Sequence, residues 1–144
     1  MNIKPLSSKL ILAGGIIQLI LAIFHFVWPF SFIQTESFAV LNDQARDLVM
    51  LNCISVGASL GVFALLSFYF SRSIKTQSLA AVFFCLTEVI FWSVRLILEL
   101  IFPVRIPVYF VAGPSIFIVA GAIFIITIYL IPFIFRKEMS DKNN

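Results

Sequence analysis

The sequence predicts an all-α integral membrane protein, an up-down four-helix bundle in which the 144 residues form a single transmembrane domain. Three observations lead to this fold class: the composition, four long apolar runs, and the position of the basic residues. Apolar residues make up 61% of the chain and charged residues 12%, against roughly 45–50% and about 25% in soluble domains. A chain this short cannot bury so much apolar surface in its own core, so its solvent is expected to be lipid.

Four apolar runs define the expected helices. They cover residues of about 10–32, 48–71, 78–102 and 108–135, and residues 136–144 are expected to form a cytoplasmic tail. Each run reaches the length of roughly 20 apolar residues that a helix needs to cross a bilayer. The runs are continuous rather than alternating, and open sheet edges are not tolerated in lipid, so helices are favoured over strands.

The connections between the runs are short, which makes consecutive helices antiparallel. Residues 71–77 join the second run to the third, and two prolines within residues 103–107 end the third helix and begin the fourth. The longest connection, residues 31–47, is expected outside the cell. Asn42 or Asp43 is expected to cap the helix that follows it, because a side-chain oxygen there can accept an unpaired backbone N–H.

The basic residues indicate the orientation, because cytoplasmic loops carry an excess of Lys and Arg. With both termini in the cytoplasm, Arg46 and Arg105 lie outside. Seven basic residues then lie on the cytoplasmic side: Lys4, Lys9, Arg72, Lys75, Arg136, Lys137 and Lys142. The net charge of +3 is spread over the ends of the apolar runs, so it reports membrane orientation and excludes a nucleic-acid-binding face. The expected location is the cell membrane, with the chain crossing it several times.

Gly57 and Gly61 place two small residues four positions apart on the second expected helix. Small residues let the backbones of membrane helices approach closely. The pair is interpreted as a packing face, either within the bundle or against a second copy or a partner membrane protein.

The third expected helix carries a polar stripe. At about 100° per residue, four side chains fall on one side of the helix: Glu88, Trp92, Arg95 and Glu99. Arg95 and Glu99 are four residues apart and close enough to pair. Ionisable side chains at membrane depth are costly and usually face protein or water, so this stripe is the leading candidate for a functional site.

Residues on the other helices are expected to join the stripe in the outer half of the bundle. His25 and Asn52 lie at a similar depth and complete the candidate polar pocket, with Gln18, Arg46 and Tyr109 as secondary members. Three interpretations remain open: a buried network that fixes helix register, an outward-facing site for a ligand or proton, and a catalytic or metal site. In the second, His25 would titrate near neutral pH, and Glu88 would accept a proton because desolvation disfavours its charged form.

The residue types favour a non-enzymatic role without a cofactor. His25 is the single histidine in the chain, and a positive Arg95 would repel a cation, so no metal set is predicted. No recognisable nucleophile motif accompanies His25, and no catalytic residue is assigned. Cys53 and Cys85 are interpreted as apolar residues within the helices, because they form no metal-binding or redox spacing.

Three segments carry a resemblance to known proteins: His25 in the first helix, the segment 42–46 with its Arg46, and Phe91-Trp92-Ser93-Val94-Arg95-Leu96 in the third helix. Together they resemble a group of small bacterial four-helix integral membrane proteins that has no assigned activity. The resemblance implies a bacterial inner-membrane setting and directs attention to His25, Arg46 and Arg95. It implies no reaction.

The preferred function is to bind or translocate a small ligand or proton at an outward-facing polar pocket within the membrane, or to serve as an accessory subunit. One alternative is an intramembrane enzyme that acts on a lipid or quinone-like substrate. The other is a purely structural membrane protein that docks through its helix-packing glycines. The expected partners are the lipid bilayer, a small ligand or proton, and a second copy or another membrane protein.

Overall fold

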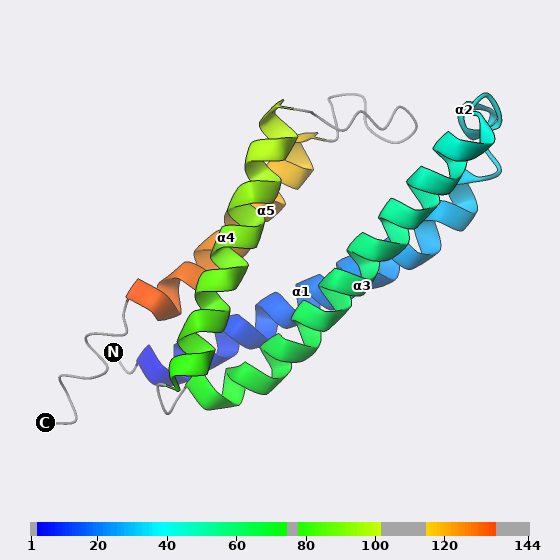
Figure 1. Cartoon of the computed structure of the whole chain (residues 1–144). Coiled ribbons are helices and arrows are strands. Elements are labelled where there is room, and N and C mark those ends of the chain that lie inside the picture. Colours follow the sequence, from blue (N-terminus) through cyan, green and yellow to red (C-terminus); the bar gives the residue numbers. More distant parts are fainter. Residues whose placement is uncertain (1–2, 75–77, 102–114, 135–144) are drawn as a thin grey trace, which may run out of the picture. The chain divides into compact units, whose positions relative to one another are not determined.

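The computed structural model describes residues 3–74, 78–101 and 115–134 (Figure 1). The helices are α1 Ile3–Phe32, α2 Glu36–Ala39, α3 Asp43–Ser73, α4 Leu79–Ile101 and α5 Ser115–Ile134. Within these residues all regular structure is helical, as the sequence predicts. Tyr109, the prolines of segment 103–107 and the tail 136–144 fall outside the described residues.

Three stretches are helical, long and apolar enough to cross a membrane. They are Leu6–Ser31, Asp43–Ser73 and Leu79–Ile101, and each matches one of the apolar runs of the sequence. The fourth run corresponds to α5, whose 20 residues begin at Ser115. The first seven residues of that run, 108–114, are not among the described residues.

Two helices extend beyond their apolar runs. α1 begins at Ile3 rather than near residue 10, and α3 begins at Asp43 rather than near residue 48. Apolar content marks the part of a helix suited to lipid, whereas backbone hydrogen bonding continues into the polar ends. At the start of α3 the expected cap is present, because the Ala45 N–H donates to Asn42 Oδ1 at 2.8 Å. The one-turn helix α2 was not predicted, since four residues carry too little periodicity to be recognised.

The described chain divides into two compact units. One contains residues 13–68, which are most of α1, all of α2 and most of α3. The other contains the first residues of α1, the end of α3, and helices α4 and α5.

In the unit of residues 13–68, α1 and α3 pack side by side through glycines at two levels (Figure 1). A Cβ placed on Gly15 of α1 would lie only 2.8 Å from Ser67 Cβ of α3. A Cβ placed on Gly57 of α3 would lie 3.2 Å from His25 Cβ of α1. Moving from Gly15 to His25 along α1 therefore corresponds to moving back from Ser67 to Gly57 along α3, which is the register of an antiparallel pair.

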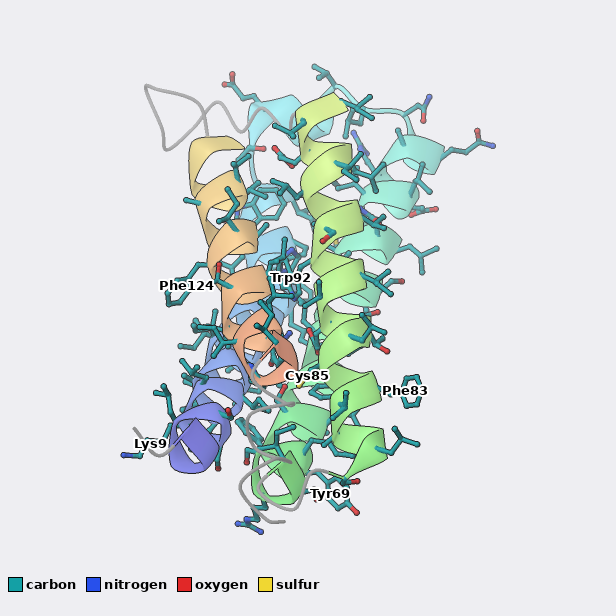
Figure 2. All side chains as sticks on the ribbon, turned by 90° about the vertical axis from the view of Figure 1, so that its left-hand side faces the viewer. Lys9, Tyr69, Phe83, Cys85, Trp92 and Phe124 are labelled. Atoms are coloured by element: carbon teal, nitrogen blue, oxygen red, sulfur yellow. The ribbon has the colours of Figure 1, made fainter. Side chains whose placement is uncertain are left out.

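In the other unit, α4 packs against α5. Aromatic rings connect the two helices to the last turns of α3: Phe84 stacks on Phe70 at 5.0 Å between centroids and meets Tyr129 edge-on at 5.9 Å. Tyr129 and Cys85 are fully buried. Figure 2 shows Phe83 pointing outward from α4, on a different side from Cys85 and Trp92. This packing determines which face of α4 is covered.

Candidate functional site

Helix α4 has one covered face and one exposed face. The buried residues share one side of the helix and are Ala81, Val82, Phe84, Cys85, Glu88, Trp92 and Glu99. Exposed apolar residues occupy the other side, among them Phe83, Ile90, Val94 and Ile97. The stripe identified in the sequence therefore lies on the covered face, where Glu88, Trp92 and Glu99 are buried and Arg95 is partly exposed.

Two carboxylic acids of the stripe are fully buried. Glu88 is 0% exposed and Glu99 is 1% exposed. A buried carboxylate is costly unless it is paired or hydrogen-bonded, or else it takes up a proton. Two such groups on one apolar helix therefore require compensating partners, and the helix supplies one of them.

Arg95 is the partner of Glu99. Its Nη1 lies 2.8 Å from Glu99 Oε2, the expected contact between residues four apart on a helix. The distance defines an ion pair, although the N–H bonds are not aligned for a hydrogen bond to this oxygen. The Arg95 side chain keeps 35% of its surface exposed, whereas the Glu99 side chain keeps none. Arg95 therefore lies at the edge of the covered face, and Glu99 lies within it.

Trp92 lies between these charged residues and is 7% exposed. Its ring meets Phe91 edge-on at 5.7 Å between centroids. The indole Nε1 is buried and has no hydrogen-bond partner among the described residues. An indole nitrogen can only donate, and leaving such a donor unsatisfied in a buried position costs about 1–3 kcal/mol. The polar face of α4, defined as Glu88, Trp92, Arg95 and Glu99, thus contains a free buried donor.

His25 and Asn52 belong to the other unit. The Nδ1–H of His25 donates to the Leu21 carbonyl oxygen at 2.8 Å, which leaves Nε2 as the acceptor of the neutral ring. Phe24 contacts this ring edge-on at 5.8 Å. The side chain of Asn52 is exposed on α3. The sequence prediction that His25 and Asn52 join the polar face of α4 remains a prediction.

Gln18 forms a polar contact inside the pair of α1 and α3. It is fully buried, and its Oε1 lies 3.4 Å from Ser67 Oγ, which also donates to the Phe63 carbonyl oxygen at 2.8 Å. The contact is close to Gly15, whose added Cβ would lie 2.8 Å from the Cβ of the same Ser67. Gln18 therefore connects the two helices within their interface. Ser67 was not predicted, because a lone serine within an apolar run gives no signal of its own.

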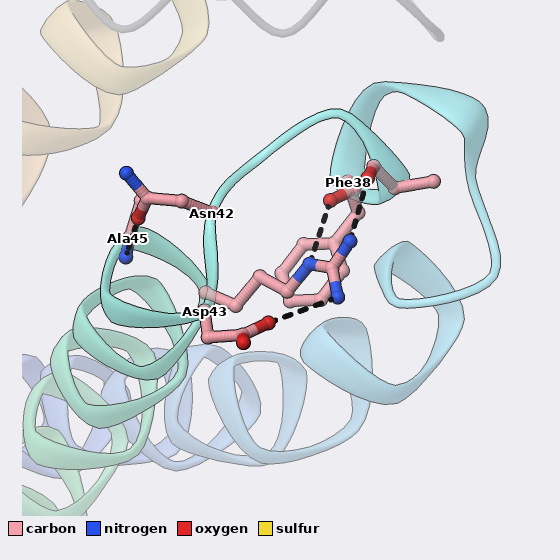
Figure 3. Close-up of polar contacts among 6 residues, drawn as sticks. Phe38, Asn42, Asp43 and Ala45 are labelled. Carbon is pink, nitrogen blue, oxygen red and sulfur yellow. Dashed lines mark hydrogen bonds and ion pairs between the residues drawn. The ribbon is translucent and has the colours of Figure 1, made fainter.

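Arg46 organises the loop between α1 and α3 (Figure 3). Its Nε donates to the Phe38 carbonyl oxygen at 3.2 Å, and its Nη2 donates to the Ala39 carbonyl oxygen at 2.5 Å. Asp43 Oδ1 lies 3.4 Å from Nη1, and the guanidinium carbon lies 5.8 Å from the centre of the Phe38 ring. Arg46 thus supplies donors for the last carbonyls of α2, which gives it a local structural role.

The two packing glycines differ in their surroundings. Gly57 is buried against Ala22, His25 and Phe26 of α1. A Cβ placed on Gly61 would have nothing within 4 Å. Within the described residues, Gly57 therefore belongs to an intramolecular interface and Gly61 does not.

The described residues contain no group of three or more His, Cys, Asp or Glu side chains that could hold a metal ion. Ser7, which the sequence did not single out, is a further buried polar residue whose hydroxyl has no partner among the described atoms. Comparison of the chain with protein-family models, with curated proteins and with solved structures found no match.

Proposed function

We propose that the chain is a membrane protein with four spans and both termini in the cytoplasm, in a bacterial inner membrane. The polar face of α4 would bind or translocate a small ligand or a proton that arrives from the outer side. The three long apolar helices support membrane insertion. So do the large apolar side chains that the same helices expose, including Ile20, Leu65 and Leu100, because extended apolar surface is rare on soluble monomers.

The single observation that carries the proposal is the burial of Glu88 and Glu99 on an otherwise apolar helix. Buried ionisable groups in membrane spans usually belong to ligand sites or proton pathways, or pair with one another. Glu99 has Arg95 as its ion-pair partner. Glu88 lies about three turns before Glu99 on the same face and is fully buried near the middle of α4, so we take its carboxyl as the proton-accepting group of the proposal.

The membrane topology can be tested with single cysteines in a background where Cys53 and Cys85 are replaced by alanine. Asp43→Cys, at the start of α3, should react with a membrane-impermeant maleimide in intact cells. Arg72→Cys, in the last turn of α3, should react after the inner membrane is opened. Labelling of both positions in intact cells, or of neither after lysis, contradicts the proposed topology.

The site can be tested by proton flux. We expect purified protein in liposomes with an enclosed pH-sensitive dye to carry protons along an imposed gradient. Glu88→Gln keeps the size of the side chain and removes its ionisable group, so flux should fall to the level of empty liposomes. Thr87→Val is the matched control, because Thr87 is the exposed neighbour on the same helix.

The amount of folded protein must be measured beside the flux, by size-exclusion chromatography and circular dichroism. If Glu88 belongs to a functional site, Glu88→Gln should lose proton flux while the amount of folded protein stays nearly unchanged. A parallel loss of folded protein and flux in Glu88→Gln would instead assign Glu88 to a structural network. Flux that survives unchanged in Glu88→Gln would remove it from the proton pathway.

A second candidate function, an accessory subunit, is favoured by the open space at Gly61 on α3. A small residue on an exposed helix face lets another membrane helix approach closely. Cross-linking at Gly61→Cys between copies, or to a second membrane protein, would support this role.

A further inference from the structure

The indole donor of Trp92 indicates what kind of molecule the polar face of α4 accepts. Resting on the proposed function, we infer that this face binds the carbonyl oxygen of an uncharged lipophilic molecule, held by Trp92 Nε1 and the guanidinium of Arg95. Three properties of the described side chains support this class of ligand at the proposed site.

The first property is the unsatisfied donor. Trp92 is more than nine-tenths buried, and its Nε1 has no acceptor among the described residues. Buried polar groups in folded proteins nearly always have a partner. Since an indole N–H donates and never accepts, the missing partner must present an acceptor atom to it. A carbonyl oxygen is such an atom.

The second property is a neighbouring donor. Arg95 follows Trp92 by three residues, so their side chains are neighbours on the helix surface, with Cβ atoms about 5–6 Å apart. A guanidinium has five N–H donors, and the contact with Glu99 involves Nη1. With 35% of the Arg95 side chain exposed, the group can offer a second hydrogen bond to an acceptor that already contacts Trp92.

The third property is the charge of the face. The positive charge of Arg95 is already matched by the carboxylate of Glu99 at 2.8 Å. Glu88 adds a second buried carboxyl group on the same face. An anionic ligand would add negative charge where no unmatched positive charge remains, and burying such a charge is costly. An uncharged acceptor avoids this cost, so a carbonyl is favoured over a carboxylate or phosphate.

The surroundings of the site favour a lipophilic molecule. Besides its polar residues, the covered side of α4 carries the buried apolar residues Ala81, Val82, Phe84 and Cys85, and the Phe91 ring meets Trp92 edge-on. A ligand that lies along this side of the helix beside Trp92 therefore contacts apolar side chains for most of its length. Two sources share the required chemistry: the ring carbonyl of a quinone and the ester carbonyl of a glycerolipid.

The test uses full-length protein labelled with ¹⁵N in its indole groups, in dodecyl maltoside, a detergent that has no carbonyl. The probes are a decyl-substituted benzoquinone, dioctanoylglycerol, dodecanoate and dodecane. The chain has two tryptophans, so Trp28 serves as an internal control. We expect the indole proton signal of Trp92 to move downfield with the quinone or the diacylglycerol, and the probe that saturates at lower concentration identifies the source.

Trp92→Phe provides the matched variant, because it keeps an aromatic ring and removes the donor. Its affinity for the preferred uncharged probe, measured by equilibrium dialysis, should be roughly 3- to 10-fold lower, the effect of one uncharged hydrogen bond. Trp28→Phe should bind that probe like the wild type. Circular dichroism of both variants establishes that they are folded.

Several results would overturn the inference. They are the absence of a Trp92 shift with both uncharged probes, a shift with dodecane alone, tighter binding of dodecanoate than of either uncharged probe, and equal affinity of Trp92→Phe and wild type. The proposed function fails separately, through proton flux that does not depend on Glu88. Flux that depends on Glu88 without any Trp92 shift would retain the proposed function and remove the carbonyl ligand.

Discussion

Alanine substitution of the glycines should separate close helix contacts from open surface. In a helix interior, alanine is favoured over glycine by about 0.8–1.0 kcal/mol. At Gly61 and Gly121 a Cβ would meet nothing within 4 Å, so Gly61→Ala and Gly121→Ala should raise the free energy of unfolding by about that amount. These two variants measure the gain in helix propensity without any change in packing.

Gly15→Ala should instead lower the free energy of unfolding. Its Cβ would lie 2.8 Å from Ser67 Cβ and 2.9 Å from Phe68 Cε1. The Phe68 ring can turn aside, but Ser67 Cβ is attached to the backbone of α3, so the two helices must separate. Overpacking of this kind costs about 1–3 kcal/mol, which exceeds the gain in propensity. We expect Gly15→Ala to be less stable than Gly61→Ala by about 1–3 kcal/mol, the overpacking cost, because both variants share the gain in helix propensity.

The stability of Gly57→Ala should fall between those of Gly15→Ala and Gly61→Ala. The added Cβ would lie 3.2 Å from His25 Cβ and 3.3 Å from the Ala22 carbonyl oxygen. The assay is reversible unfolding by sodium dodecyl sulfate in mixed micelles, followed by circular dichroism. If Gly15→Ala and Gly61→Ala gain the same stability, then α1 and α3 do not approach closely at Gly15 and the reasoning is wrong. Size-exclusion chromatography of each variant checks that the oligomeric state is the same.

Two further predictions concern the arginines. Arg95→Leu should destabilise the fold by about 3 kcal/mol, the lower end of the cost of removing one partner from a buried ion pair, because solvent reaches part of Arg95. The double variant with Glu99→Leu should recover most of that loss in the same unfolding assay, and no recovery would show that the pair is not coupled. Arg46→Ala should speed hydrogen exchange of the amides in Glu36–Ala39, since it removes the donors to the Phe38 and Ala39 carbonyls. Asp43→Asn should leave the exchange nearly unchanged, because Asp43 is 97% exposed and exposed ion pairs contribute little; equal effects of the two substitutions would contradict the role given to Arg46.

Local patterns in the sequence predicted much of α4. The interval from Glu88 to Trp92, Arg95 and Glu99 places the four residues on one side of any helix, and the structure has this side covered. The pairing of Arg95 with Glu99 follows from the same geometry. The cap at Asn42 was predictable for a related reason, because capping depends on residues within one turn of the helix.

The sequence by itself determined the helical class, the apolar runs and the polar face of α4, because helical periodicity is a property of a single segment. Tertiary structure decided which of two similar glycines meets another helix, Gly57 rather than Gly61. It also decided that Trp92 Nε1 lacks an acceptor within the described chain, and that the Arg46 donors bind the end of α2. Each of these depends on how separate elements of the chain lie against one another, which packing sets and residue spacing does not.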